Sequence, residues 1–238
     1  MKKYLNSPYY IIPEELKIRY SMNNAFKIIY DPTDDSVKNE VFWKNSEIEQ
    51  YREKLTLENI KNNQEGWSPY GNKACLDIIN SIINKNVAVI GSQNPWIEAI
   101  LLNYNNKVTT IEYNLPKCNY DNLEIKNYFE FQKENNNFDV IITFSSVEHS
   151  GFGRYGDPLN PDGDIETMDS IYNNLKKDGL LIWGAPVGKN DGLVWNRHRI
   201  YGPNRLLLIF KKFKYISSSD NLFKERWEQP VIILKKIN

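Results

Sequence analysis

Short apolar runs alternate with amphipathic segments along residues 67–238. Apolar and β-branched runs predict strands at 87–91, 108–114, 123–126, 138–146, 180–188, 214–219 and 230–237, and the continuous apolar run at 87–91 predicts a buried parallel strand. Between the strands, apolar residues at helical spacing predict helices at 72–84, 95–104, 127–135, 165–179 and 203–213. This order predicts an α/β fold with a mostly parallel sheet, helices on both faces and an antiparallel hairpin at one edge.

Residues 1–66 have a different pattern, with more charge and fewer strand-like runs. The strongest signal there is a helix at 46–62, which Ser46 and Glu49 would begin with a capping box. We therefore expect a mainly helical N-terminal extension over 1–66 and a separate α/β domain over 67–238. The extension would cap the main domain, cover the substrate or form a dimer contact.

Composition and charge exclude several classes of protein. The 238 residues are 41% hydrophobic, which is enough for a core, and 30 basic residues balance 30 acidic ones. A neutral chain has no general electrostatic affinity for nucleic acid, so we expect no such partner. Cys75 and Cys118 form no CxxC pair, the N-terminus has no apolar signal region, and no apolar run approaches the ~20 residues of a membrane span. We expect a cytoplasmic protein of undetermined oligomeric state.

The carboxyl ends of the predicted strands are where a ligand would bind in such a sheet. Gly91 ends the first strand and allows a tight turn into Ser92 and Gln93. Glu112 ends the next strand, about 20 residues after Gly91, which is the spacing of an acid that binds ribose hydroxyls. The sequence GSQNP at 91–95 has one glycine where a dinucleotide loop has three, so an ordinary strand–helix turn is the alternative.

The two histidines, His149 and His198, both fall in predicted loops at this edge. Histidine suits general acid–base chemistry near neutral pH, although a structural hydrogen bond is the common alternative. Glu148 stands directly before His149. The glycine-rich loop 151–164 that follows has aspartates that could bind a metal or make Asx turns, and we expect turns and no metal.

Arginine is scarce in this chain, and an aromatic-rich stretch at 195–205 contains three arginines. The guanidinium group of arginine binds phosphates and other anions through two parallel hydrogen bonds, so the stretch is typical of a site for an anionic or sugar-phosphate group. A solvated basic loop is the alternative. From this stretch and the preceding loop we expect these substrate contacts: Arg154, Tyr155, Asp157, Arg197, Arg199 and Tyr201.

The segments 87–102, 108–114, 138–164 and 197–210 together resemble the class I S-adenosylmethionine-dependent methyltransferase superfamily, and more closely the DUF268 family. The resemblance implies a Rossmann-like, class I methyltransferase-like fold and S-adenosylmethionine as cofactor. The implied cofactor contacts are Gly91, Ser92 and Gln93 near the methionine part, Glu112 and Tyr113 at the ribose, and Ser145 and Ser146 beside cofactor and substrate. Glu148 and His149 resemble the E-H pair that follows the fourth strand in the superfamily.

The resemblance therefore implies a methyltransferase acting on a small polar acceptor. Similar proteins look like parts of surface-polysaccharide pathways, which indicates a sugar or nucleotide sugar as the acceptor. We expect His149 to be the general base, with His198 as the second candidate, and we expect Glu148 to be a further catalytic residue. Because the loop at 91–95 lacks the usual further glycines, two alternatives stay open: another enzyme on the same fold, or a non-catalytic binding subunit.

Overall fold

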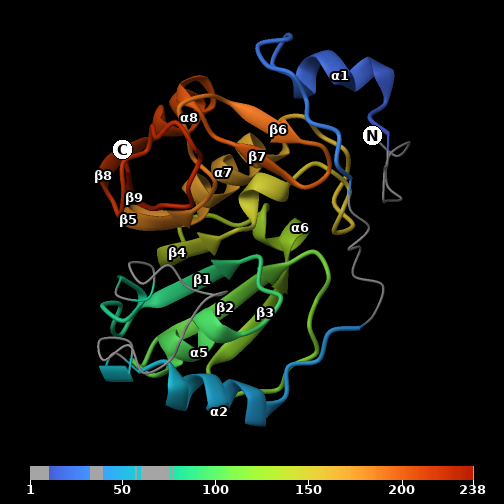
Figure 1. Cartoon of the computed structure of the whole chain (residues 1–238). Coiled ribbons are helices and arrows are strands. Elements are labelled where there is room, and N and C mark those ends of the chain that lie inside the picture. Colours follow the sequence, from blue (N-terminus) through green and yellow to red (C-terminus); the bar gives the residue numbers. More distant parts are fainter. Residues whose placement is uncertain (1–10, 33–39, 57, 60–75, 77, 238) are drawn as a thin grey trace.

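A computed structural model describes residues 11–32, 40–56, 58–59, 76 and 78–237. Its centre is a seven-stranded sheet in the order β3-β2-β1-β4-β5-β9-β8 (Figure 1). The strands are β1 (Asn86–Ile90), β2 (Lys107–Glu112), β3 (Leu123–Asn127), β4 (Phe138–Phe144), β5 (Leu175–Gly184), β8 (Phe213–Ser218) and β9 (Val231–Lys236). Strands β1 to β5 pair in parallel, while β9 is antiparallel to β5 and β8. The predicted α/β sheet with a terminal antiparallel hairpin is confirmed.

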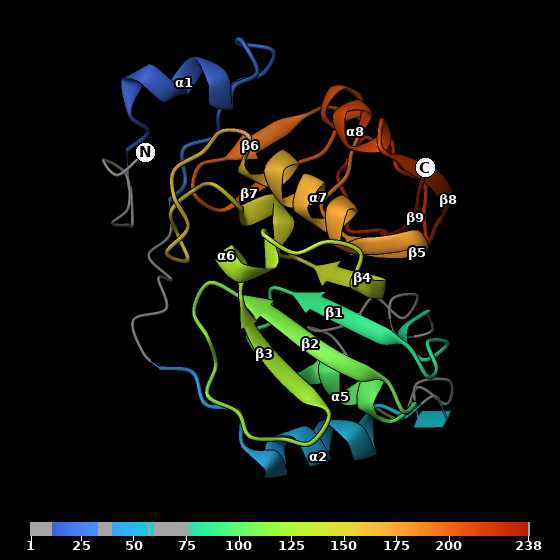
Figure 2. The same cartoon turned by 180° about the vertical axis from the view of Figure 1, so that it is seen from behind.

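The two faces of the sheet are both apolar, which explains the continuous runs in the sequence. In β1, Ala88 and Ile90 point into the core on one face, and Val87 and Val89 into the core on the other. Helices α6 (Tyr128–Phe131), α7 (Gly163–Asn174) and α8 (Pro203–Phe210) cover the first face. Helix α5 (Trp96–Leu102) covers the second, with α2 (Asn45–Lys54) packed outside it (Figure 2).

Some predicted boundaries are wrong. The helix predicted at 165–179 ends at Asn174, because Leu175 already pairs with Phe138 as the first residue of β5. The capping box at Ser46 is absent: the N-cap is Lys44 and makes no side-chain cap. A hairpin of β6 (Gly192–Val194) and β7 (His198–Ile200) replaces the predicted loop. Residues 72–75, the start of the helix predicted at 72–84, lie outside the described residues.

The described parts of the N-terminal segment pack on the sheet domain in two separate places (Figure 1). Helix α1 (Glu14–Tyr20) lies near the β6–β7 hairpin, where Tyr20 packs with Phe152 and Trp195. Helix α2 lies at the other end of the molecule, and its Ile48 packs in one cluster with Ala99 of α5. The described parts of this segment therefore contact opposite ends of the α/β domain.

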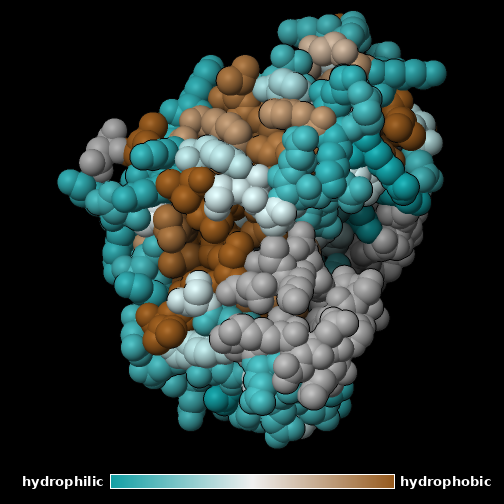
Figure 3. Space-filling view, turned by 60° about the vertical axis from the view of Figure 1, so that its left-hand side comes forward, coloured by the Kyte–Doolittle hydropathy of each residue, from teal (hydrophilic) through white to brown (hydrophobic). Residues whose placement is uncertain are grey.

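The outer surface is uneven in polarity. Hydrophobic surface gathers on the side of the molecule that carries β8 and β9 (Figure 3), and Tyr215 and Ile216 of the edge strand β8 are exposed there. Within the described residues, no helix has the length and apolar character that crossing a bilayer requires.

Candidate active site

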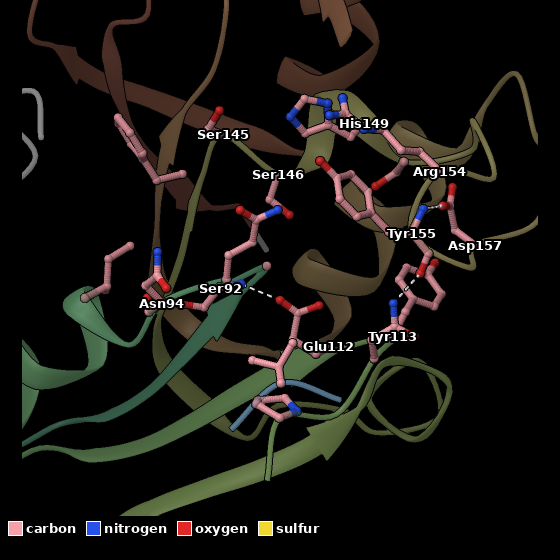
Figure 4. Close-up of a pocket in the computed structure, with 18 of the residues that line it drawn as sticks. Ser92, Asn94, Glu112, Tyr113, Ser145, Ser146, His149, Arg154, Tyr155 and Asp157 are labelled. Carbon is pink, nitrogen blue, oxygen red and sulfur yellow. Dashed lines mark hydrogen bonds between the residues drawn. The ribbon is translucent and has the colours of Figure 1, made fainter. Parts of the chain in front are cut away.

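A pocket of about 740 Å³ opens at the carboxyl ends of β1, β2 and β4, where the strand order reverses. This is the position at which open α/β sheets bind ligands. Every residue expected to contact the cofactor lines it: Gly91, Ser92, Gln93, Glu112, Tyr113, Ser145 and Ser146. Figure 4 shows Ser92 and Glu112 toward one end of this pocket and His149, Arg154 and Tyr155 toward the other.

Gly91 makes the turn that ends β1. Its φ is +76°, and a Cβ built there would lie 1.8 Å from Ser146 Oγ. The close approach of the β1 and β4 ends therefore requires a residue with no side chain.

Replacing Gly91 by alanine is expected to destabilise the protein by about 2–4 kcal/mol, because the left-handed backbone strain and the collision with Ser146 add together. Gly156→Ala is the matched control: φ is +89°, but the nearest atom to its Cβ would be 3.8 Å away, so only the strain of about 1 kcal/mol applies. Urea unfolding of both variants measures the difference. Equal losses would mean that the β1 and β4 ends are not this close.

Glu112 ends β2 with its carboxyl directed into the pocket (Figure 4). The backbone N–H of Ser92 donates to one of its oxygens, which ties the loop after β1 to the end of β2. Burial raises the pKa of Glu112 to about 7, and the nearby charge of Glu98 adds to the effect. Glu112 and the loop after β1 therefore line the same pocket.

His149 ends the short helix η2 (Val147–His149), directly after β4. Its Nδ1 donates to the carbonyl oxygen of Arg197, which leaves Nε2 as the nitrogen that can accept a proton. Burial lowers the pKa of His149 to about 4, so the ring is neutral at neutral pH. The side chain keeps 16% of its surface exposed and lines the pocket, with the Tyr155 ring 5.8 Å away.

Glu148 is not at the pocket. Its side chain is 1% exposed, and burial raises its pKa to about 7. Oε1 lies 3.9 Å from His149 Nε2, too far for a hydrogen bond, and neither carboxyl oxygen has a hydrogen-bond partner among the described residues. Glu148 is thus buried next to His149 and does not line the pocket.

The loop 151–157 contributes Arg154, Tyr155 and Asp157 to the lining of the pocket, near His149. The Asp157 carboxyl accepts hydrogen bonds from the backbone N–H groups of Gly151 (2.6 Å), Gly153 (3.2 Å) and Tyr155 (3.1 Å). Asp157 therefore shapes this loop, as expected for an aspartate that makes turns. The Arg154 guanidinium lies 5.1 Å from the centre of the Tyr155 ring, and both side chains line the pocket.

The other expected substrate contacts lie elsewhere, which corrects their predicted position. Arg199 is buried, donates to the Ser150 carbonyl at 2.6 Å and pairs with Asp164 at 3.5 Å, because a buried carboxylate needs a cation beside it. Tyr201 is buried against Trp183.

Arg197 and His198, which the sequence analysis placed at the site, also lie outside the pocket lining. Arg197 pairs with Asp31 at 3.1 Å, and the His198 ring lies 5.5 Å from Trp227. Arg197 still contributes to the site through its carbonyl oxygen, which orients the His149 ring.

Several lining residues were not predicted. Asn94 and Asn114 follow the same strand ends as Ser92 and Tyr113, so their position in the sequence contained the signal. Val41 and Gln229 come from segments before α2 and β9 and had no such signal. Among the described residues, no group of three or more His, Cys, Asp or Glu side chains is arranged to hold a metal ion.

Comparison with known proteins identifies the family. The family described as "Caenorhabditis protein of unknown function, DUF268" matches residues 84–236. The chain belongs to the DUF268 family. A search of curated proteins found no match to this DUF268 chain.

Solved structures share the fold of this DUF268 protein. The 1,6-didemethyltoxoflavin-N1-methyltransferase of Burkholderia thailandensis, bound to 1,6-didemethyltoxoflavin and S-adenosylhomocysteine, is 12% identical with a TM-score of 0.54, covering 87% of this chain and 100% of that chain. A TehB-like S-adenosylmethionine-dependent methyltransferase of Corynebacterium glutamicum is 15% identical with a TM-score of 0.50. The match covers 82% of this chain and 100% of that chain. The DUF268 protein therefore has the Rossmann-like fold of class I methyltransferases.

Proposed function

We propose that this DUF268 protein is an S-adenosylmethionine-dependent methyltransferase that acts on a small polar acceptor. The observation that carries the proposal is the joining of Gly91, Ser92 and Glu112 at one pocket at the switch point of the sheet. In nucleotide-binding folds a glycine turn and an acid at these two strand ends hold the ligand. The shared fold supports the proposal, since the Burkholderia relative holds S-adenosylhomocysteine.

The residues present fit this cofactor. The glycine turn at Gly91 leaves no side chain over the loop, and the buried carboxyl of Glu112 suits two ribose hydroxyls. When bound, S-adenosylmethionine supplies an electrophilic methyl group. Ser145 and Ser146, at the end of β4, would separate the cofactor end of the pocket from the acceptor end.

His149 is the proposed general base. With Nδ1 held by the Arg197 carbonyl, Nε2 of the neutral ring is the nitrogen that would take the acceptor's proton. Apart from removing this proton, the protein has only to position the acceptor in line with the methyl group. Arg154 would bind an anionic group and the Tyr155 ring would pack on an apolar face of the acceptor. A sugar or nucleotide sugar of surface-polysaccharide synthesis fits these two side chains and the family resemblance.

Replacing Glu112 by alanine is expected to weaken S-adenosylhomocysteine binding by about 1–3 kcal/mol, because charge-assisted hydrogen bonds to two hydroxyls are lost. Isothermal titration calorimetry measures the change, with the surface variant Glu130→Ala as control. Unchanged affinity in a folded Glu112→Ala protein would remove this residue from the site.

The second candidate is an enzyme on the same fold that takes a different nucleotide. It is favoured by the Ser92–Asn94 loop, whose residues stand where further glycines are usual. Calorimetry with S-adenosylmethionine and with nucleotide sugars, each alone, separates the two. Binding of a nucleotide sugar without S-adenosylmethionine binding would support the second candidate and contradict the first.

A further inference from the structure

A second buried carboxyl lies directly behind the proposed cofactor loop. Glu98, in the first turn of α5, is 0% exposed. Its Oε1 accepts a hydrogen bond from Thr110 Oγ1 at 2.8 Å, and its Oε2 lies 3.0 Å from Ser92 Oγ. Ser92 is thus shared: its backbone N–H donates to Glu112 and its hydroxyl contacts Glu98. The proposed reaction gives Glu98 no part.

The two contacts of the Ser92 hydroxyl indicate the protonation state of Glu98. Ser92 Oγ lies 2.9 Å from the carbonyl oxygen of Asn94 as well as 3.0 Å from Glu98 Oε2. A hydroxyl has one proton to donate, and the carbonyl can only accept. Both contacts are hydrogen bonds at once if Ser92 donates to Asn94 and a protonated Glu98 donates to Ser92. Burial raises the pKa of Glu98 to about 7, which acts in the same direction.

The contacts of Ser92 assign the proton of this carboxyl pair to Glu98. Both carboxyls contact Ser92, and an ionised Glu98 would raise the pKa of Glu112, so the neutral form of Glu98 favours an ionised Glu112. Glu112 faces the backbone N–H of Ser92, a donor that favours the ionised form. Burial raises the pKa of the nearby Cys118 thiol, and an ionised Glu98 would raise it further.

We propose that Glu98, as a neutral acid, is a positioning residue that holds the Ser92–Asn94 loop in place of the missing glycines and leaves Glu112 as the ionised carboxyl of the pair. The loop is supported from outside as well, since Trp43 Nε1 donates to the Gln93 carbonyl at 3.2 Å. The consequence for ligand binding rests on the proposed function, because it is Glu112 that would hold the ribose.

Two variants separate the neutral acid from the carboxylate. In Glu98→Gln, the amide N–H group can donate to Ser92 and the amide oxygen can accept from Thr110, so S-adenosylhomocysteine affinity stays near the wild-type value. In Glu98→Leu the donor is lost, and affinity falls by about 10-fold. At alkaline pH, wild-type affinity declines as Glu98 ionises, while the Gln variant keeps its affinity. A Gln variant as weak as the Leu variant, or a Leu variant as strong as wild type, overturns the inference.

A second measurement needs no ligand. Infrared spectra near pH 6 should show a protonated carboxyl band in the wild-type protein that Glu98→Gln removes. Amide hydrogen exchange at Ser92 and Gln93 should be unchanged in the Gln variant and accelerated in the Leu variant. If these results hold but the wild type does not bind S-adenosylhomocysteine, the cofactor proposal fails and the positioning role stands. If Glu98→Gln leaves the carboxyl bands unaltered, the positioning role fails, even where the Leu variant does not fold.

Discussion

Replacing His149 by alanine is expected to lower kcat by about 10²–10⁴-fold, the usual contribution of a positioned general base. Affinity for S-adenosylhomocysteine should barely change, because His149 lies at the acceptor end of the pocket and Glu112 at the other (Figure 4). The measurement is methyl transfer to an acceptor identified by screening anionic sugars. His198→Ala is the matched control: His198 is not among the lining residues, so kcat should stay near wild type.

The pH profile gives this prediction a second test. A base must be neutral to accept a proton, so the rate falls as pH drops through its pKa. Burial lowers the pKa of His149 to about 4, and the acid limb should therefore lie well below the ~6.5 of an ordinary histidine. The His149→Ala variant should lack that limb. If the variant instead keeps the limb and shows a raised KM, His149 only anchors the Arg197 carbonyl.

Asp164→Asn is expected to reduce the free energy of unfolding by about 3–5 kcal/mol, the loss typical of breaking a buried ion pair. Asp164 is 0% exposed and accepts hydrogen bonds from the Arg205 guanidinium, one of them at 2.7 Å, while Arg199 lies 3.5 Å away. Burial raises the pKa of Asp164, but the charges of Arg199 and Arg205 outweigh it and hold the pKa below its usual range. The variant leaves two buried cations without their carboxylate.

A neighbouring aspartate provides the control. Asp162 also pairs with an arginine, Arg19, at 2.6 Å, but both side chains are about half exposed. Asp162→Asn should therefore change stability by less than about 1 kcal/mol. Urea unfolding of both variants at pH 7 measures the contrast. Similar small losses for the two would show that the Asp164 cluster does not stabilise the core as its burial indicates.

The sheet could be predicted because its strands are buried on both faces. The runs at 87–90 and 140–142 can be recognised without a known pairing partner, since a strand that is covered on both faces is apolar at successive positions. The end of α7 could not be predicted, because Leu175 continues the apolar spacing of the helix. Only the pairing of Leu175 with Phe138 ends the helix. The β6–β7 hairpin has three-residue strands, too short for a period to show.

In the site, too, the residues that could be predicted are those whose position follows from the strands. Gly91, Glu112 and His149 each lie at the end of a strand or in the loop that follows it, so the general rule for parallel sheets places them together. Arg199 looked like a substrate contact because its partner Asp164 is remote in sequence. No signal in the sequence singles out Glu98, because its hydrogen-bond partners Thr110 and Ser92 come from other elements.

The place of β9 in the sheet has a consequence for the chain as it is synthesised. Strand β9 lies between β5 and β8 but follows both in the sequence. Until Val231–Lys236 leave the ribosome, β5 and β8 cannot be joined, and each keeps an open edge. Open edges that carry Leu181 and Ile182 recruit other chains and chaperones. A stop codon before Val231 is therefore expected to yield aggregates instead of a shorter folded protein.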